Sequence, residues 1–122
     1  MDGIVKYNHW LPKLISKKMP IDAITIWPFI FVKLDYFDQI LLNHEKIHIR
    51  QYTETLVVGF YLIYAYDYLL NRLIRKKSHV KAYLNIRLER EAYANQYDEN
   101  YMYTRKHYAW RHYKHGRHTI RN

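Results

Sequence analysis

The 122-residue chain contains no cysteine. This absence excludes disulfide bonds, zinc sites built from thiolates and cysteine nucleophiles. It leaves the redox compartment open, because there is no thiol whose oxidation state could report it. Any metal site must therefore take its ligands from histidine, aspartate and glutamate.

Long apolar runs are also missing. The run from Ile21 to Val32 contains Asp22 and Pro28, and no small-residue pattern typical of signal-peptide cleavage follows it. The run from Thr55 to Tyr66 has no charge over 12 residues, which is short for a membrane span and closer to a buried helix. We predict a cytoplasmic protein. Peripheral attachment to a membrane stays open, because tyrosines and basic residues accompany the second run.

Acidic residues are scarce toward the C-terminus. Residues 1–60 carry seven Lys/Arg and six Asp/Glu, whereas residues 61–122 carry thirteen and five. After Glu99 there are six Lys/Arg and no acid, interleaved with tyrosine, tryptophan and histidine. This composition suits contact with nucleic acid or with an anionic membrane surface. We predict a basic aromatic tail at residues 104–122, with a solvated tail as the alternative.

The remaining residues, 1–103, fit one small domain of mainly α fold class. Residues 24–32 are rich in β-branched and aromatic side chains and predict a strand, or a hairpin if Pro28 separates two short strands. Asp38 is positioned as the N-cap of a helix from Gln39 to Gln51. A second helix is expected over 54–75, or a continuation of the first after a bend near residues 52–53, and a third helix from 78 or 80 to about 103.

The expected helix at 39–51 contains the sequence His44-Glu45-Lys46-Ile47-His48, which is the HExxH pattern. Residues four apart lie on one helical face, so both imidazoles can reach one tetrahedral ion. Glu45 is placed beside that ion, where it can accept a proton from a zinc-bound water. The pattern therefore predicts a zinc site with His44 and His48 as ligands and Glu45 as the catalytic base.

A catalytic zinc needs a third protein ligand. We expect Glu91, on the third helix, because Asn95 lies four residues later on the same face and could orient a ligating histidine. Glu89 is the alternative. It lies two residues away and points to a nearly opposite side of the helix, so only one of the two glutamates should face the site.

The HExxH helix followed by Glu91-Ala92-Tyr93-Ala94-Asn95 resembles the gluzincin class of zinc metallopeptidases, in which a glutamate often followed by alanine is the third ligand. Residues 42–51 together with 89–95 also resemble small bacterial proteins described as zinc peptidases. The resemblance covers roughly residues 24–100 and implies His44, His48 and Glu91 as ligands and Glu45 as base. The chain departs from the gluzincin pattern at Asn95, where that class usually has aspartate.

Together these features predict a zinc-dependent metallopeptidase acting on a peptide or protein substrate, with an HExxH helix and a glutamate helix. The alternative is a non-catalytic zinc-binding module whose basic tail docks onto nucleic acid or an anionic membrane.

Overall fold

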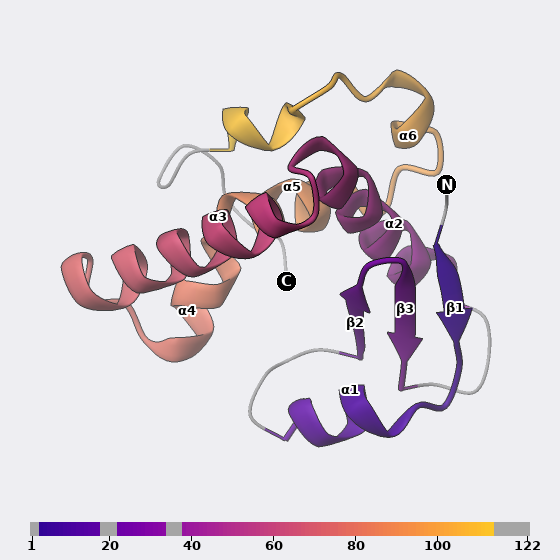
Figure 1. Ribbon diagram of the computed structural model, residues 1–122, viewed down its shortest axis with the longest axis horizontal. Helices are drawn as coiled ribbons and strands as arrows, with labels where there is room; N and C mark the ends of the chain where they lie inside the picture. The colour runs from indigo at the N-terminus through magenta and orange to yellow at the C-terminus, as the bar shows by residue number, and fades with distance from the viewer. Residues whose placement is uncertain (1–2, 18–21, 34–37, 114–122) are drawn as a thin grey trace.

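A computed structural model describes residues 3–17, 22–33 and 38–113 (Figure 1). It is a small, mainly helical domain, as the sequence predicts, with a three-stranded sheet near the N-terminus. The elements are β1 (Ile4–Lys6), α1 (Trp10–Ile15), β2 (Ala23–Ile26), β3 (Phe29–Val32), α2 (Gln39–Glu54), α3 (Val58–Leu69), the π-helix η1 (Leu70–Ile74), α4 (His79–Leu84), α5 (Arg87–Asn95), α6 (Tyr101–Thr104) and the 3-10 helix η2 (Ala109–His112).

The strands form one sheet in the order β1-β3-β2. β2 and β3 pair antiparallel and are joined by a turn at Trp27-Pro28, so the predicted hairpin is confirmed. β1 was not predicted; it pairs parallel to β3. Because β3 lies in the centre, β2 is an edge strand with one side free of strand partners in the described sheet.

Helix α2 carries the HExxH pattern and begins where the sequence indicates. The carboxylate of Asp38 accepts a hydrogen bond from the backbone N–H of Leu41, 3.1 Å away, which caps the helix. The helix runs to Glu54, and the chain then turns at Leu56 and Val57, both at positive φ. This turn lies a few residues beyond the bend expected near residues 52–53 and separates α2 from α3.

The third predicted helix is not continuous. Its start lies at the first of the two positions expected, where Ser78 caps the helix by accepting from the N–H of Lys81. The helix ends at Leu84, however, and α5 begins anew at Arg87. The carboxylate of Asp67, on α3, accepts from both the backbone N–H and the guanidinium of Arg87 at 2.9–3.0 Å. This long-range partner replaces an N-cap side chain and fixes α5 against α3.

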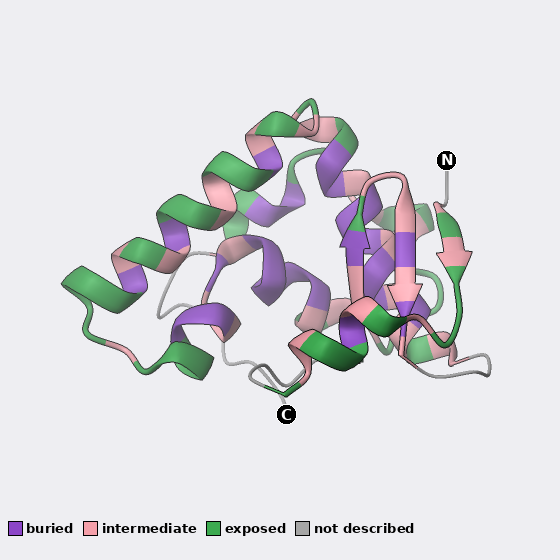
Figure 2. Cartoon of the chain, turned by 60° about the horizontal axis from the view of Figure 1, so that its bottom comes forward, coloured by how far each residue is buried: buried purple, intermediate pink, exposed green. Residues whose placement is uncertain are grey.

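Two apolar clusters flank α2. One joins Tyr52, Phe60 and Leu88 with other side chains of α3, α4, α5 and η2. The other joins Ile30 and Ile49 between the sheet and α2. Figure 2 shows the buried residues of α2 and α5 in the middle of the molecule. The buried face of α2 therefore meets the sheet on one side and α5 on the other.

The segment after residue 103 packs onto the domain as far as it is described. Trp110 is buried, and the side chain of Arg105 is 1% exposed. Arg105 donates to both carboxylate oxygens of Glu54, at 2.6 and 2.8 Å, and to Glu91. The predicted boundary at 103 is thus not the end of the packed structure, which continues to Tyr113. Residues 114–122 of the predicted tail lie outside the described residues.

Arg105→Lys should lower the free energy of unfolding by about 1.5–3 kcal/mol. Lysine keeps the charge but cannot bond Glu54 and Glu91 with one planar fork, and hydrogen bonds to charged groups are each worth about this much. Urea unfolding followed by circular dichroism measures the loss. Lys106→Arg, at an exposed neighbour, is the control and should change nothing. Equal stability of Arg105→Lys and wild type would show that the ion pairs do not hold this segment.

Candidate metal centre

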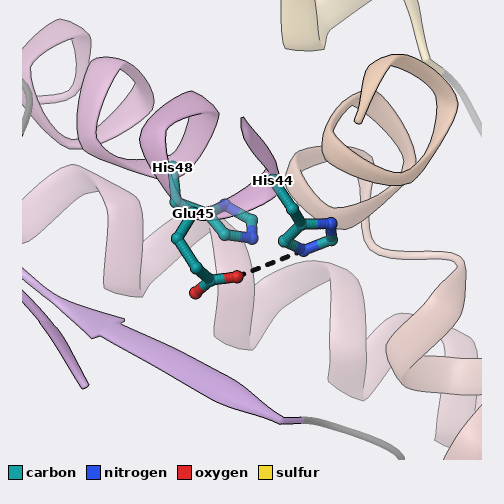
Figure 3. A group of neighbouring side chains, drawn as sticks. All are labelled: His44, Glu45 and His48. Atoms are coloured by element: carbon teal, nitrogen blue, oxygen red, sulfur yellow. Dashed lines mark ion pairs between the residues drawn. The ribbon is translucent and has the colours of Figure 1, made fainter. Parts of the chain in front are cut away.

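The three motif side chains converge on one face of α2 (Figure 3). His44, Glu45 and His48 are all about 95% buried, and each presents a ligand atom within 4.8 Å of the others. The Oε2 atom of Glu45 lies 3.6 Å from Nε2 of His44. The structure therefore brings together the two histidines and the glutamate that the sequence selects.

A second carboxylate, from α5, completes the cluster. Oε1 of Glu89 lies 3.1 Å from Nε2 of His44 and 3.2 Å from Nε2 of His48. A tetrahedral zinc ion with ligands at about 2.0–2.1 Å holds its ligand atoms about 3.3 Å apart. The two distances from Oε1 of Glu89 to the Nε2 atoms are close to that value. The other oxygen, Oε2, accepts a 2.8 Å hydrogen bond from the hydroxyl of Tyr64 on α3, which fixes the carboxylate.

Glu91, which the sequence favoured as third ligand, is not brought to the histidines. Its side chain is fully buried on another side of α5. There it accepts hydrogen bonds from Tyr101 at 2.7 Å and Gln51 at 2.9 Å, and from Arg105. A carboxylate engaged by three donors has no oxygen left to approach the cluster. Of the two glutamates only one faces the site, as expected, but that one is Glu89.

The outer nitrogens of both histidines face glutamine side chains. Nδ1 of His44 lies 2.8 Å from Oε1 of Gln96, and Nδ1 of His48 lies 2.7 Å from Oε1 of Gln51. The amide nitrogen of Gln51 donates to Glu91 and to the carbonyl of Leu88, so its oxygen must point to His48. Such partners hold the proton on Nδ1 and turn Nε2 toward the cluster.

Each imidazole thus has a hydrogen-bond acceptor at both nitrogens, although a neutral imidazole has only one N–H. Two arrangements satisfy this geometry: both rings carry an extra proton, or a cation lies between the Nε2 atoms and Glu89. Burial alone would lower the pKa of His48, but the charge and hydrogen bond of Glu89, with Glu45, raise it to about 9. Burial would raise the pKa of Glu89, yet His48 and His44 hold it well below its usual range. The cluster is therefore built to hold positive charge, and its donor set fits zinc.

Glu45 is held beside the cluster by β2. The hydroxyl of Thr25 donates to Oε1 of Glu45 at 2.9 Å. The other oxygen, Oε2, is the one that faces His44. The hydrogen bond fixes the carboxylate while leaving one oxygen able to accept a proton, as a general base requires.

The cluster opens into a cavity of about 380 Å³ between β2, α2 and α3. His44, Glu45, His48 and Glu89 all line it, together with the whole of β2 and the aromatic rings of Tyr52, Phe60, Tyr61, Tyr64 and Tyr83. A second cavity of about 240 Å³ shares Ala23, His44, Glu45 and Tyr83 with the first and continues toward Asp38. The two cavities therefore meet at the cluster.

Sequence reasoning gave Glu89 only as the alternative to Glu91. It missed Gln51, Gln96 and Thr25, which contact His48, His44 and Glu45. Gln51 had a usable signal, because it lies three residues after His48 on the same helical face. Asn95, expected to orient a histidine, instead donates to the carbonyl of Glu91 and to the hydroxyl of Tyr113. The polar residue four positions after Glu91 therefore carried no information about the site.

Gln51→Met should weaken zinc binding by about ten- to a hundredfold while the fold is kept. Methionine is similar in length but cannot accept the Nδ1 proton of His48, and loss of such outer partners typically costs this much affinity. Zinc affinity is measured by competition with a chromogenic chelator. Gln39→Met, at the start of the same helix, where the side-chain amide donates to Asn43, is the control and should leave affinity unchanged. Equal affinities would mean that Gln51 does not orient His48.

Comparison with models of known protein families, with curated proteins and with solved structures finds no match to this chain.

Proposed function

We propose that this protein is a zinc-dependent hydrolase that cleaves peptide bonds. The observation that carries the proposal is that Oε1 of Glu89 lies 3.1 and 3.2 Å from the Nε2 atoms of His44 and His48, with Glu45 fixed alongside in a cavity. Two histidines and one carboxylate are the donor set of catalytic zinc in several peptidases, with a fourth position left for water.

His44, His48 and Glu89 would hold the ion. A zinc ion bound there supplies Lewis acidity and lowers the pKa of a bound water. Glu45 accepts the water proton on the oxygen that Thr25 leaves free and returns it to the leaving amine. Tyr64 keeps the Glu89 carboxylate in place, and Gln51 and Gln96 keep both Nε2 atoms unprotonated.

The edge strand β2 supports a peptide as the substrate. Its residues Ala23 to Ile26 line the larger cavity, and an extended peptide can add to a free strand edge through main-chain hydrogen bonds. The cavity walls are mainly Ile, Phe and Tyr side chains. We therefore expect extended peptides with apolar or aromatic side chains next to the cleaved bond.

The motif resemblance to gluzincins supports the same chemistry through His44, Glu45 and His48. The resemblance does not extend to the third ligand. It implies Glu91, whereas Glu89 is the glutamate that faces the histidines. The proposed site thus uses the glutamate before Arg90, not the one before Ala92.

The experiment is cleavage of a fluorogenic peptide library by the full chain in three forms: as purified with zinc, after chelation, and after zinc is restored. We expect cleavage in the first and third forms only. Cleavage that persists in the chelated form would contradict the proposal. Zinc binding without cleavage of any library member would favour a structural zinc site, for which the burial of all four side chains is the specific support.

A further inference from the structure

The outward side of the α3–η1 helix is apolar and exposed. Leu62, Leu69 and Leu73 are 67%, 52% and 69% exposed. They continue a face, here called the α3 face, whose other members are Leu56, Val58, Tyr61, Tyr66 and Ile74. In Figure 2 the exposed residues follow one side of this helix along its length. Single exposed apolar residues are ordinary, but a contiguous row of this length indicates a contact surface.

The opposite side of the same helix already forms the core contacts. Phe60, Asp67 and Asn71 are buried there, and Asn71 donates to the carbonyl of Ala82 at 3.0 Å. The α3 face is therefore not needed to hold the helix to the domain. Five of its members lie on one helical stripe, because they fall at i, i+4, i+8, i+11 and i+15: Val58, Leu62, Tyr66, Leu69 and Leu73.

The C-terminal end of the α3 face is bordered by positive charge. Residues 68–86 contain five Lys/Arg and no Asp/Glu. Arg72, Arg75 and Lys76 are exposed. The guanidinium of Arg72 donates to the backbone carbonyl of Lys77, and that of Arg75 donates to the side-chain oxygen of Asn71. Both acceptors are neutral. Across the described ranges no carboxylate forms an ion pair with any of these three residues. The positive charge is therefore available to an anionic partner.

Among the described residues, no helix has both the length and the apolar character to cross a membrane. An apolar helical stripe bordered by Lys and Arg is the pattern of helices that lie in the membrane interface. We propose that the α3 face docks onto an anionic lipid bilayer, with Leu62, Leu69 and Leu73 entering the acyl boundary and Arg72, Arg75 and Lys76 contacting lipid phosphates. This docking does not depend on the proposed hydrolysis.

Docking in this way places the larger cavity beside the bilayer. Phe60, Tyr61 and Tyr64 of α3 line that cavity, and Tyr61 belongs to the α3 face as well. A ligand of the cavity would then be one presented at the membrane surface.

The first test is co-sedimentation of the full chain with vesicles of phosphatidylcholine, with and without phosphatidylglycerol. Each interfacial Lys or Arg contributes roughly fivefold to binding an anionic surface. The variant Arg72→Gln/Arg75→Gln/Lys76→Gln should therefore bind anionic vesicles about a hundredfold more weakly than wild type. The control variant Lys6→Gln/Lys13→Gln/Lys17→Gln has the same net charge and alters exposed residues elsewhere. It should lose at most a few-fold. Equal losses in the two variants would show that net charge alone drives the binding, and this result would overturn the proposal.

The second test locates the contact. Because the chain has no cysteine, Leu62→Cys can carry a single environment-sensitive fluorophore, and Tyr103→Cys, at a position 87% exposed on α6, gives the matched control. Anionic vesicles should shift the emission of the label at 62 to the blue and leave the label at 103 unchanged. No shift at 62, or equal shifts at both, would overturn the proposal. A blue shift at 62 that grows with protein concentration without vesicles would assign the α3 face to a second copy of the chain instead.

Discussion

Glu45→Gln is expected to keep its zinc and to lose hydrolysis by about a hundred- to ten-thousand-fold, the range typical of general-base catalysis. Glutamine is nearly isosteric and can still accept the hydrogen bond from Thr25, which holds the side chain beside β2. It cannot accept a proton from a water molecule. The expected loss is therefore in the catalytic rate and not in the metal or the fold.

The assay measures kcat and bound zinc for the same preparation. Thr25→Val is an informative companion, because it removes the hydrogen bond to Glu45 but keeps the carboxylate. It should reduce the rate much less than Glu45→Gln does. Undiminished cleavage by Glu45→Gln with zinc bound would exclude Glu45 as the base, and the proposed mechanism with it.

Glu89→Gln is expected to lower zinc affinity by more than about a hundredfold. Loss of a residue that merely hydrogen-bonds a metal ligand typically costs about ten- to a hundredfold in affinity. Among the described residues, Glu89 alone has a carboxylate oxygen within 3.2 Å of both Nε2 atoms. The uncharged amide is also a poor zinc ligand. His44→Ala and His48→Ala should remove binding in the same assay.

Glu91→Gln is the matched control two residues along α5. It removes a charge that Arg105 and Tyr101 bind, so the free energy of unfolding should fall. The zinc affinity of the folded protein should fall by no more than the ten- to hundredfold that is typical when a metal ligand loses a hydrogen-bond partner. Comparing the two variants by chelator competition and by urea unfolding separates the roles: Glu89 for the metal, Glu91 for the fold. A larger loss of zinc affinity in Glu91→Gln would reverse this assignment.

The sequence was sufficient where local rules decide the structure. Asp38 and Ser78 cap helices as their side chains require, and Pro28 separates two strands. The i, i+4 spacing placed His44 and His48 on one face. These features depend on neighbours in the chain, so local patterns predict them.

The sequence was insufficient where long-range partners decide. The start of α5 is set by Asp67, twenty residues earlier, and this start determines which glutamate turns toward α2. Glu91 is drawn away by Arg105, which lies in a segment predicted as a tail. Neither partner follows from a local pattern, because each depends on how α3 and residues 105–110 pack against α5.

The most direct test of the metal centre is anomalous X-ray scattering, recorded at the zinc edge from crystals of the full chain grown with zinc. One peak is expected within about 2.0–2.2 Å of Nε2 of His44, Nε2 of His48 and a carboxylate oxygen of Glu89. His112, His115 and His118 can collect zinc separately, and a peak whose ligands are these histidines does not bear on the cluster. A zinc-replete crystal without a peak at His44, His48 and Glu89, or with Glu91 as the ligand, would contradict the account.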